Sequence, residues 1–193
     1  MNNYEYIIAS LPDIRQGEKA SCPDPESIIE EIRGLLSGKD TETFGRFLDG
    51  FEADKLDESF YKEMFSSRNA FVRDYFLFDL NLRNTKTEYL NERLGRPGMQ
   101  DMLFPEEYGD FEGKEDVRRA LETDDILERE RALDNMMWKK VEELTELHVF
   151  DLDIILGFVA RLKTVQRWLK LDPESGRELF RKLVNEIKTN RNI

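Results

Sequence analysis

Hydrophobic side chains recur every three or four residues through most of the chain, and this spacing predicts α-helices. The clearest example lies within residues 71–93, where the large apolar and aromatic side chains share one face of a helix. These side chains are Phe71, Tyr75, Phe78, Leu82 and Tyr89. We therefore expect one long helix that packs against the rest of the protein along this face.

A second row of side chains follows the same period beside the first, and it changes from apolar to charged. The row contains Val72, Phe76, Asp79, Arg83, Lys86, Leu90 and Arg93. Opposite charges three or four residues apart are neighbours on a helix surface. The row predicts an organised polar surface that contacts partners. Its simpler interpretation is a solvated helix face with local ion pairs.

Capping residues and helix breakers divide the chain into further helices. Asp24 is a favoured N-cap and Pro25 fits the first helical position, whereas Gly95 and Pro97 end the long helix. The pattern predicts helices at 24–36, 41–51, 57–65, 67–94, 114–122, 125–147, 151–171 and 172–190. The alternation at Tyr4–Ile8 is typical of a strand, but it is too short to decide the fold class.

These patterns predict an all-α fold, an elongated helical bundle with long antiparallel helices. Residues 95–113 lack a helical period but carry Met102, Leu103 and Phe104, so we expect an ordered irregular crossover packed on the bundle. The whole chain, 1–193, is expected to form a single helical domain. Within it, 1–96 and 112–193 are candidate sub-bundles that the crossover joins.

The net charge of −12 argues against a primary nucleic-acid role, because binding to phosphates needs a basic surface. The charge is unevenly distributed along the chain. Residues 151–193 contain nine Lys/Arg and six Asp/Glu, a net charge of +3, and the remainder carries −15. Such a bipolar protein can orient between two differently charged partners. The alternative is an ordinary acidic protein whose last helix is basic.

No residue pattern indicates catalysis or a cofactor. The chain has one cysteine, Cys22, and one histidine, His148, too few for the usual zinc or di-iron sites. We expect His148 to complement the dipole at the end of a helix. Phosphate-binding loops and nucleophile motifs are absent from the sequence, and the adjacent carboxylates are typical of a solvated surface. The most apolar window, Val149–Ala160, is too short to span a membrane.

The segment 151–171 echoes the long helix. Lys163-Thr164 aligns with Lys86-Thr87, and apolar residues are again followed by basic ones, including Arg161 and Arg167. Arg161 falls between apolar side chains on one helical row. Such a charge must pair, extend to solvent or meet a partner.

The two segments resemble the repeated helical motif of the C/d family, the central-stalk proteins named C in archaeal-type and d in eukaryotic vacuolar-type rotary ATPases. In that family an aromatic-rich start is followed by an acidic residue, then Asn, Lys or Arg and Thr, and later Arg. Residues 76–87, FLFDLNLRNTKT, fit this style, with Arg93 as the later basic residue. Residues 158–165 fit the same pattern less well, because they lack its acidic residue. The opening at 4–12, YEYIIASLP, is similar to a short bacterial branch encoded among V-type ATPase genes.

The resemblance implies a non-catalytic central-stalk (rotor) subunit of a proton- or sodium-translocating V-type or A-type ATPase. A protein of this kind couples the central axle to the membrane ring of proteolipids. It is cytoplasmic, peripheral at the inner face of the cell membrane, and meets the membrane only through its partners. No cofactor, nucleic acid or small-molecule substrate is implied. The usual family chain is longer and contains three copies of the repeated motif, whereas two similar segments occur in this chain.

The charged positions of both segments are the candidate residues for partner contact. They are Asp79, Arg83, Lys86, Arg93, Arg161, Lys163 and Arg167. The alternative function is a soluble helical adaptor or scaffold protein unrelated to ATP hydrolysis. An enzyme with an unusual carboxylate site is a third and less favoured hypothesis.

Overall fold

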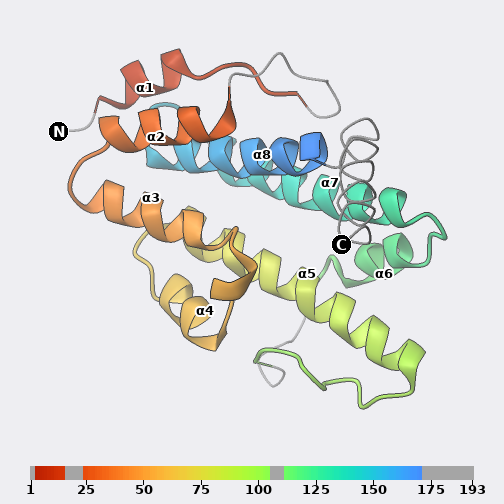
Figure 1. The fold of residues 1–193 in the computed structure, drawn as a ribbon. Helices are drawn as coiled ribbons and strands as arrows, with labels where there is room; N and C mark the ends of the chain where they lie inside the picture. Colours follow the sequence, from red (N-terminus) through yellow and green to blue (C-terminus); the bar gives the residue numbers. More distant parts are fainter. Residues whose placement is uncertain (1–2, 16–23, 105–110, 171–193) are drawn as a thin grey trace, which may run out of the picture.

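The computed structural model describes residues 3–15, 24–104 and 111–170, and within these ranges the protein is all-α (Figure 1). The helices are α1 (Tyr4–Ser10), α2 (Pro25–Leu35), α3 (Lys39–Asp49), the 3₁₀ turn η1 (Ala53–Lys55), α4 (Glu58–Phe65), α5 (Ala70–Leu94), α6 (Lys114–Leu121), α7 (Ile126–Thr145) and α8 (Leu152–Lys170). The predicted all-α bundle is therefore confirmed. The predicted helix at 172–190 lies outside the described residues.

The capping residues recognised in the sequence set several helix boundaries. The Asp24 side chain accepts a hydrogen bond from the Ser27 N–H, and Pro25 opens α2. The long helix α5 ends at Gly95, whose φ of 64° is a left-handed conformation that glycine adopts without strain. These observations confirm the predicted start of α2 and the predicted end of the long helix.

The strand-like segment Tyr4–Ile8 forms helix α1, which corrects the strand interpretation. The Asn3 side chain caps this helix by accepting a hydrogen bond from the Tyr6 N–H. Tyr4, Ile7 and Ile8 pack against the main core, as the helical spacing of three and four residues allows. In so short a segment the same apolar residues fit the two-residue period of a strand and the helical spacing of three to four residues. The Asn3 cap and the packing against the core favour the helix.

The main core contains side chains from α2, α3, α4, α5 and α8. At its centre, the Phe47 ring lies 5.1–5.8 Å, between ring centroids, from the rings of Phe51, Phe71, Tyr75 and Phe76. Contacts of this geometry add to the stabilisation from burial itself. A smaller cluster joins the second half of α5 to α6 and α7. Helix α5 therefore passes through both clusters, while α7 and α8 lie side by side (Figure 1).

Two buried asparagines attach the described part of the crossover to α5. Asn84 is 3% exposed, and its side chain donates to the Leu103 carbonyl at 2.8 Å and accepts from the Leu103 N–H at 3.2 Å. Asn91 donates to the carbonyls of Gly98 and Gln100. Backbone groups outside regular structure need such partners when they are buried. These bonds hold residues 98–103 against α5, which agrees with the predicted packing of the crossover in its described part.

We expect Asn84→Ala to lower the free energy of unfolding by about 2 kcal/mol or more, because both backbone groups of Leu103 lose their partner. Urea denaturation measures this change. The matched control is Gln100→Ala, which removes an exposed side-chain amide in the same segment and should change stability by less than about 0.5 kcal/mol. Equal effects of the two substitutions would contradict the assignment.

Candidate functional site

A groove of about 450 Å³ lies among α2, α5, α8 and the segment from the end of α3 through η1. Four of the seven predicted residues line it: Asp79 and Arg83 from α5, and Lys163 and Arg167 from α8. We call it the charged groove. Its charged lining residues are the cations Arg33, Arg83, Lys163 and Arg167 and the carboxylates Glu26, Glu30, Glu52 and Asp79. The two segments that resemble each other in sequence therefore contribute to one site.

The cations of the charged groove are paired within the chain. Lys163 Nζ lies 3.1 Å from Glu26 Oε1, which also accepts a hydrogen bond from the Gln166 side chain. Arg33 Nη1 lies 3.1 Å from Glu30 Oε1. These carboxylates are largely exposed, so each pair contributes little stability by itself. Either side chain of such a pair can consequently leave its partner and bind a charge on another protein at a small cost in folding free energy.

Asp79 occupies the inner part of the charged groove and holds two helices together. Its Oδ2 accepts hydrogen bonds from the Tyr61 hydroxyl at 2.7 Å and from Arg83 Nε at 2.8 Å. Burial, and then the negative charge of Asp79, raise the pKa of Tyr61, so its hydroxyl remains protonated and donates. Asp79 Oδ2 is therefore engaged within the chain. It connects α4 to α5 and orients Arg83, whose side chain is 48% exposed.

A cluster of polar side chains beside the groove joins α5, α7 and α8, and we call it the three-helix clamp. Lys86 Nζ lies 2.9 Å from Glu130 Oε1, and Arg167 Nη1 lies 3.7 Å from Glu130 Oε2. Arg167 also pairs with Asp134, whose Oδ2 accepts a hydrogen bond from Trp168 Nε1 at 2.7 Å. Asp134 is 9% exposed, and its burial raises its pKa while Arg167 opposes that shift.

Sequence reasoning missed the α7 members of the clamp, although the sequence contained a signal for them. Glu130 and Asp134 lie four residues apart on the same helical row as Met137 and Val141. A carboxylate on an apolar row requires a cation when the row is buried. The spacing indicates this need but does not identify Arg167, which lies 33 residues further along the chain than Asp134.

The remaining two predicted residues lie apart from the charged groove. The Arg161 guanidinium is half-buried, lies 5.7 Å from the Trp138 ring centroid and donates weakly to the Gly157 carbonyl at 3.4 Å. Burial lowers the pKa of Arg161. Arg93 is exposed and donates to the Tyr89 hydroxyl at 2.8 Å. The contact with the Trp138 ring and the bond to Gly157 thus accommodate Arg161 on an apolar row.

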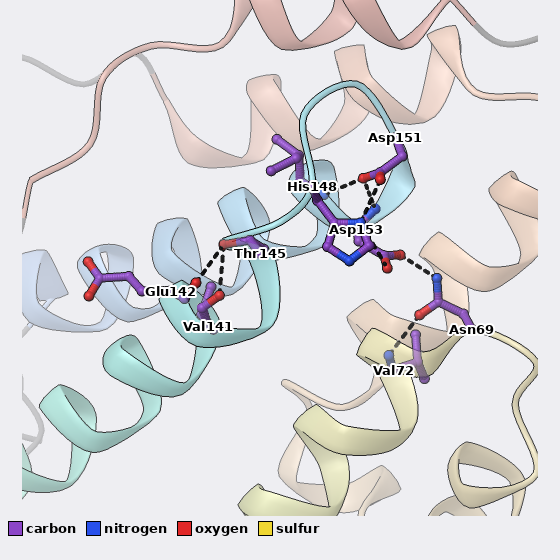
Figure 2. A network of polar contacts seen from close by, with 9 residues as sticks. Asn69, Val72, Val141, Glu142, Thr145, His148, Asp151 and Asp153 are labelled. Atoms are coloured by element: carbon purple, nitrogen blue, oxygen red, sulfur yellow. Dashed lines mark hydrogen bonds and ion pairs between the residues drawn. The ribbon is translucent and has the colours of Figure 1, made fainter.

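A second polar cluster lies at the turn between α7 and α8, and Figure 2 shows it from close by. His148 Nδ1 lies 2.6 Å from Asp151 Oδ2 and 3.7 Å from Asp153 Oδ2. Asp153 in turn accepts a hydrogen bond from the side chain of Asn69, which caps α5 through the Val72 N–H. This cluster fixes the turn to the start of α5. His148 follows the end of α7 and interacts with the acidic turn, in addition to the expected position near a helix terminus.

The described residues offer no arrangement of three or more His, Cys, Asp or Glu side chains suited to a metal ion. Among the helices of the described ranges, none is long and apolar enough to cross a membrane.

We expect the Asp134–Arg167 pair to be strongly coupled, because Asp134 is buried. A double-mutant cycle with Asp134→Asn and Arg167→Gln should give a coupling free energy of about 1–3 kcal/mol in urea denaturation. The exposed pair Asp116–Arg119 is the matched control and should give less than about 0.5 kcal/mol. Similar coupling at the two pairs would contradict the role of the three-helix clamp.

We expect the single histidine to make stability depend on pH. The hydrogen bond with Asp151 raises the pKa of His148 above its ordinary value of 6.5. A group whose pKa is raised in the folded state stabilises that state below the unfolded-state pKa, and this contribution is lost as the pH rises through the folded-state value. The free energy of unfolding should therefore fall as the pH rises from about 6. In His148→Gln this part of the decrease should be absent.

An NMR titration of the imidazole measures the same effect directly, since the chain has one histidine. The wild-type pKa should exceed 6.5, and Asp151→Asn should lower it. A wild-type value at or below 6.5 would show that the pair does not form in solution.

Comparison with known protein families gives a match over most of the chain. The family model described as "Protein of unknown function (DUF2764)" matches residues 50–191, a range that contains all seven predicted residues. Neither the curated proteins nor the solved structures include a match. Because the matched range covers more than half of the chain, the chain belongs to the DUF2764 family.

Proposed function

We propose that this protein is a non-catalytic subunit of a V-type or A-type rotary ATPase, located in the central stalk between the axle and the membrane ring. One observation carries the proposal. The two segments that resemble the repeated motif of the C/d family supply Asp79, Arg83, Lys163 and Arg167 to the same charged groove. Residues far apart in the sequence are thus combined in one site suited to recognising charge.

The polar contacts between the helices support a role in transmitting force. The three-helix clamp fixes α5 to α7 and α8 through Glu130 and Asp134. Asp79 links α4 to α5 in the same region. Helices connected by polar pairs and packed around a common apolar core move together rather than separately. A load applied at the charged groove is consequently distributed over several helices.

The alternative function is a helical adaptor or scaffold protein without a link to ATP hydrolysis. One observation favours it. The cations of the charged groove have carboxylate partners within the chain, so the groove has a structural role with or without a partner. The two functions differ in whether the protein is found with the membrane ATPase of its own cells.

Co-purification of a tagged protein with the membrane ATPase tests the proposal. We expect the wild-type protein to retain the other ATPase proteins and Lys163→Glu to reduce their recovery by about tenfold, equivalent to about 1.4 kcal/mol of binding free energy. The control is Arg119→Glu, which reverses a highly exposed charge outside the groove and should leave the recovery unchanged. A wild-type protein found in the cytosolic fraction without any other ATPase protein would contradict the proposal.

A charge-swapped variant separates binding from folding. Lys163→Glu combined with Glu26→Lys restores the internal pair with its charges exchanged. We expect this double variant to unfold at the wild-type urea concentration but to remain defective in ATPase recovery. If the swap restored recovery, the pair would act through the fold and not through contact with a partner.

A further inference from the structure

The turn between α7 and α8 exposes three apolar side chains within four residues. Leu147 is 92% exposed, Val149 is 63% exposed and Phe150 is 53% exposed. We call these residues the apolar tip. Single exposed apolar residues are normal on protein surfaces, whereas three within four residues form a candidate interaction site.

The apolar tip is held in a defined conformation. The His148 backbone N–H donates to the Thr145 carbonyl at 3.0 Å, and the His148 ring pairs with Asp151 (Figure 2). Asp151 Oδ1 accepts hydrogen bonds from the N–H groups of Asp153 and Ile154 at the start of α8. The Asp153–Asn69 contact ties the turn to α5. A turn fixed in this way loses little conformational entropy on binding, which favours affinity.

The charge around the apolar tip indicates which partner it fits. Residues 142–153 contain five carboxylates, one histidine and no lysine or arginine. The carboxylates are Glu142, Glu143, Glu146, Asp151 and Asp153. On the neighbouring elements, the cavity beside Asp151 and Asp153 is lined by the charged residues Lys39, Asp40, Glu42 and Arg68. Lys140 also pairs with Glu143 at 3.2 Å. The surroundings of the tip therefore contain seven carboxylates and three cations, and they are predominantly acidic.

An acidic surrounding disfavours insertion into a membrane, because the headgroups of anionic lipids repel it. The same surrounding favours a protein pocket that has an apolar floor and lysine or arginine at its edge, since complementary charges steer and orient the two surfaces. Aromatic side chains such as Phe150 are frequent anchors in pockets of this kind.

We propose that the apolar tip docks into an apolar pocket edged by lysine and arginine on another protein of the rotary assembly. This inference rests on the proposed function and identifies a second contact of the same protein. The tip and the charged groove involve different residues, so variants at the two sites report on them separately.

The test compares two matched pairs of substitutions in the tagged full-length protein. Leu147→Ser with Phe150→Ser removes the apolar tip, whereas Ile126→Ser with Leu127→Ser removes similarly exposed apolar side chains at the start of α7. Both double variants should fold, because exposed substitutions change stability little, and urea denaturation checks this. We expect the tip variant to recover about tenfold less solubilised membrane ATPase than wild type. The control variant should recover the wild-type amount.

Three outcomes overturn the proposal in distinguishable ways. If the folded tip variant recovers as much ATPase as wild type, the tip is not a docking element, and membership of the ATPase stands. If the wild-type protein recovers no other ATPase protein, the proposed function and the tip proposal fail together. If wild type, but not the tip variant, binds protein-free vesicles of phosphatidylserine and phosphatidylcholine, the tip is a membrane contact instead.

Discussion

Asp134 lies almost fully buried where α7 packs against α8, and a carboxylate in that position requires compensation. Arg167 and Trp168 provide it from α8. Arg167 also approaches Glu130, which binds Lys86 of α5. A small set of charges therefore links three helices that also pack through the apolar clusters. The shape of the charged groove depends on the same charges, because Arg167 belongs to both the three-helix clamp and the groove.

The functional proposal follows from this arrangement. Asp79 and Arg83 lie within the first of two segments that resemble one another, and Lys163 lies within the second. The bundle brings these residues to one groove and fixes their helices against each other. The apolar tip lies at the turn between α7 and α8. Helix α7 carries the carboxylates of the three-helix clamp, and α8 carries the second segment. A protein with such contacts on a stiff bundle is suited to connecting other proteins of an assembly.

Much of the fold was predictable because its determinants are local. Asp24, Pro25 and Gly95 act within a few residues of their own positions, and the helices begin and end accordingly. Tyr4–Ile8 was not predictable by period alone, because so short a segment fits a strand and a helix. Its helical form depends on the Asn3 cap and on packing against distant residues.

The candidate site was predictable in its residue types but not in its pairings. The sequence indicates that Arg83, Lys163 and Arg167 lie on charged rows, yet the partner of Lys163 is 137 residues away. Asn84 has its partner, Leu103, in a segment without helical period. The exposure of Leu147 and Phe150 depends on how α7 and α8 pack, since a window of apolar residues is equally compatible with burial. Long-range partners and exposure are properties of the assembled fold, which one sequence does not specify by spacing.

Electron cryo-microscopy of the membrane ATPase, isolated through a tag on this protein, tests the central claim most directly. The account predicts density for the helical bundle between the axle and the proteolipid ring. The charged groove should face one neighbouring protein of the complex, and the apolar tip should lie in a pocket of another. An intact ATPase that lacks this density, or a tagged protein that is isolated alone, would contradict the account.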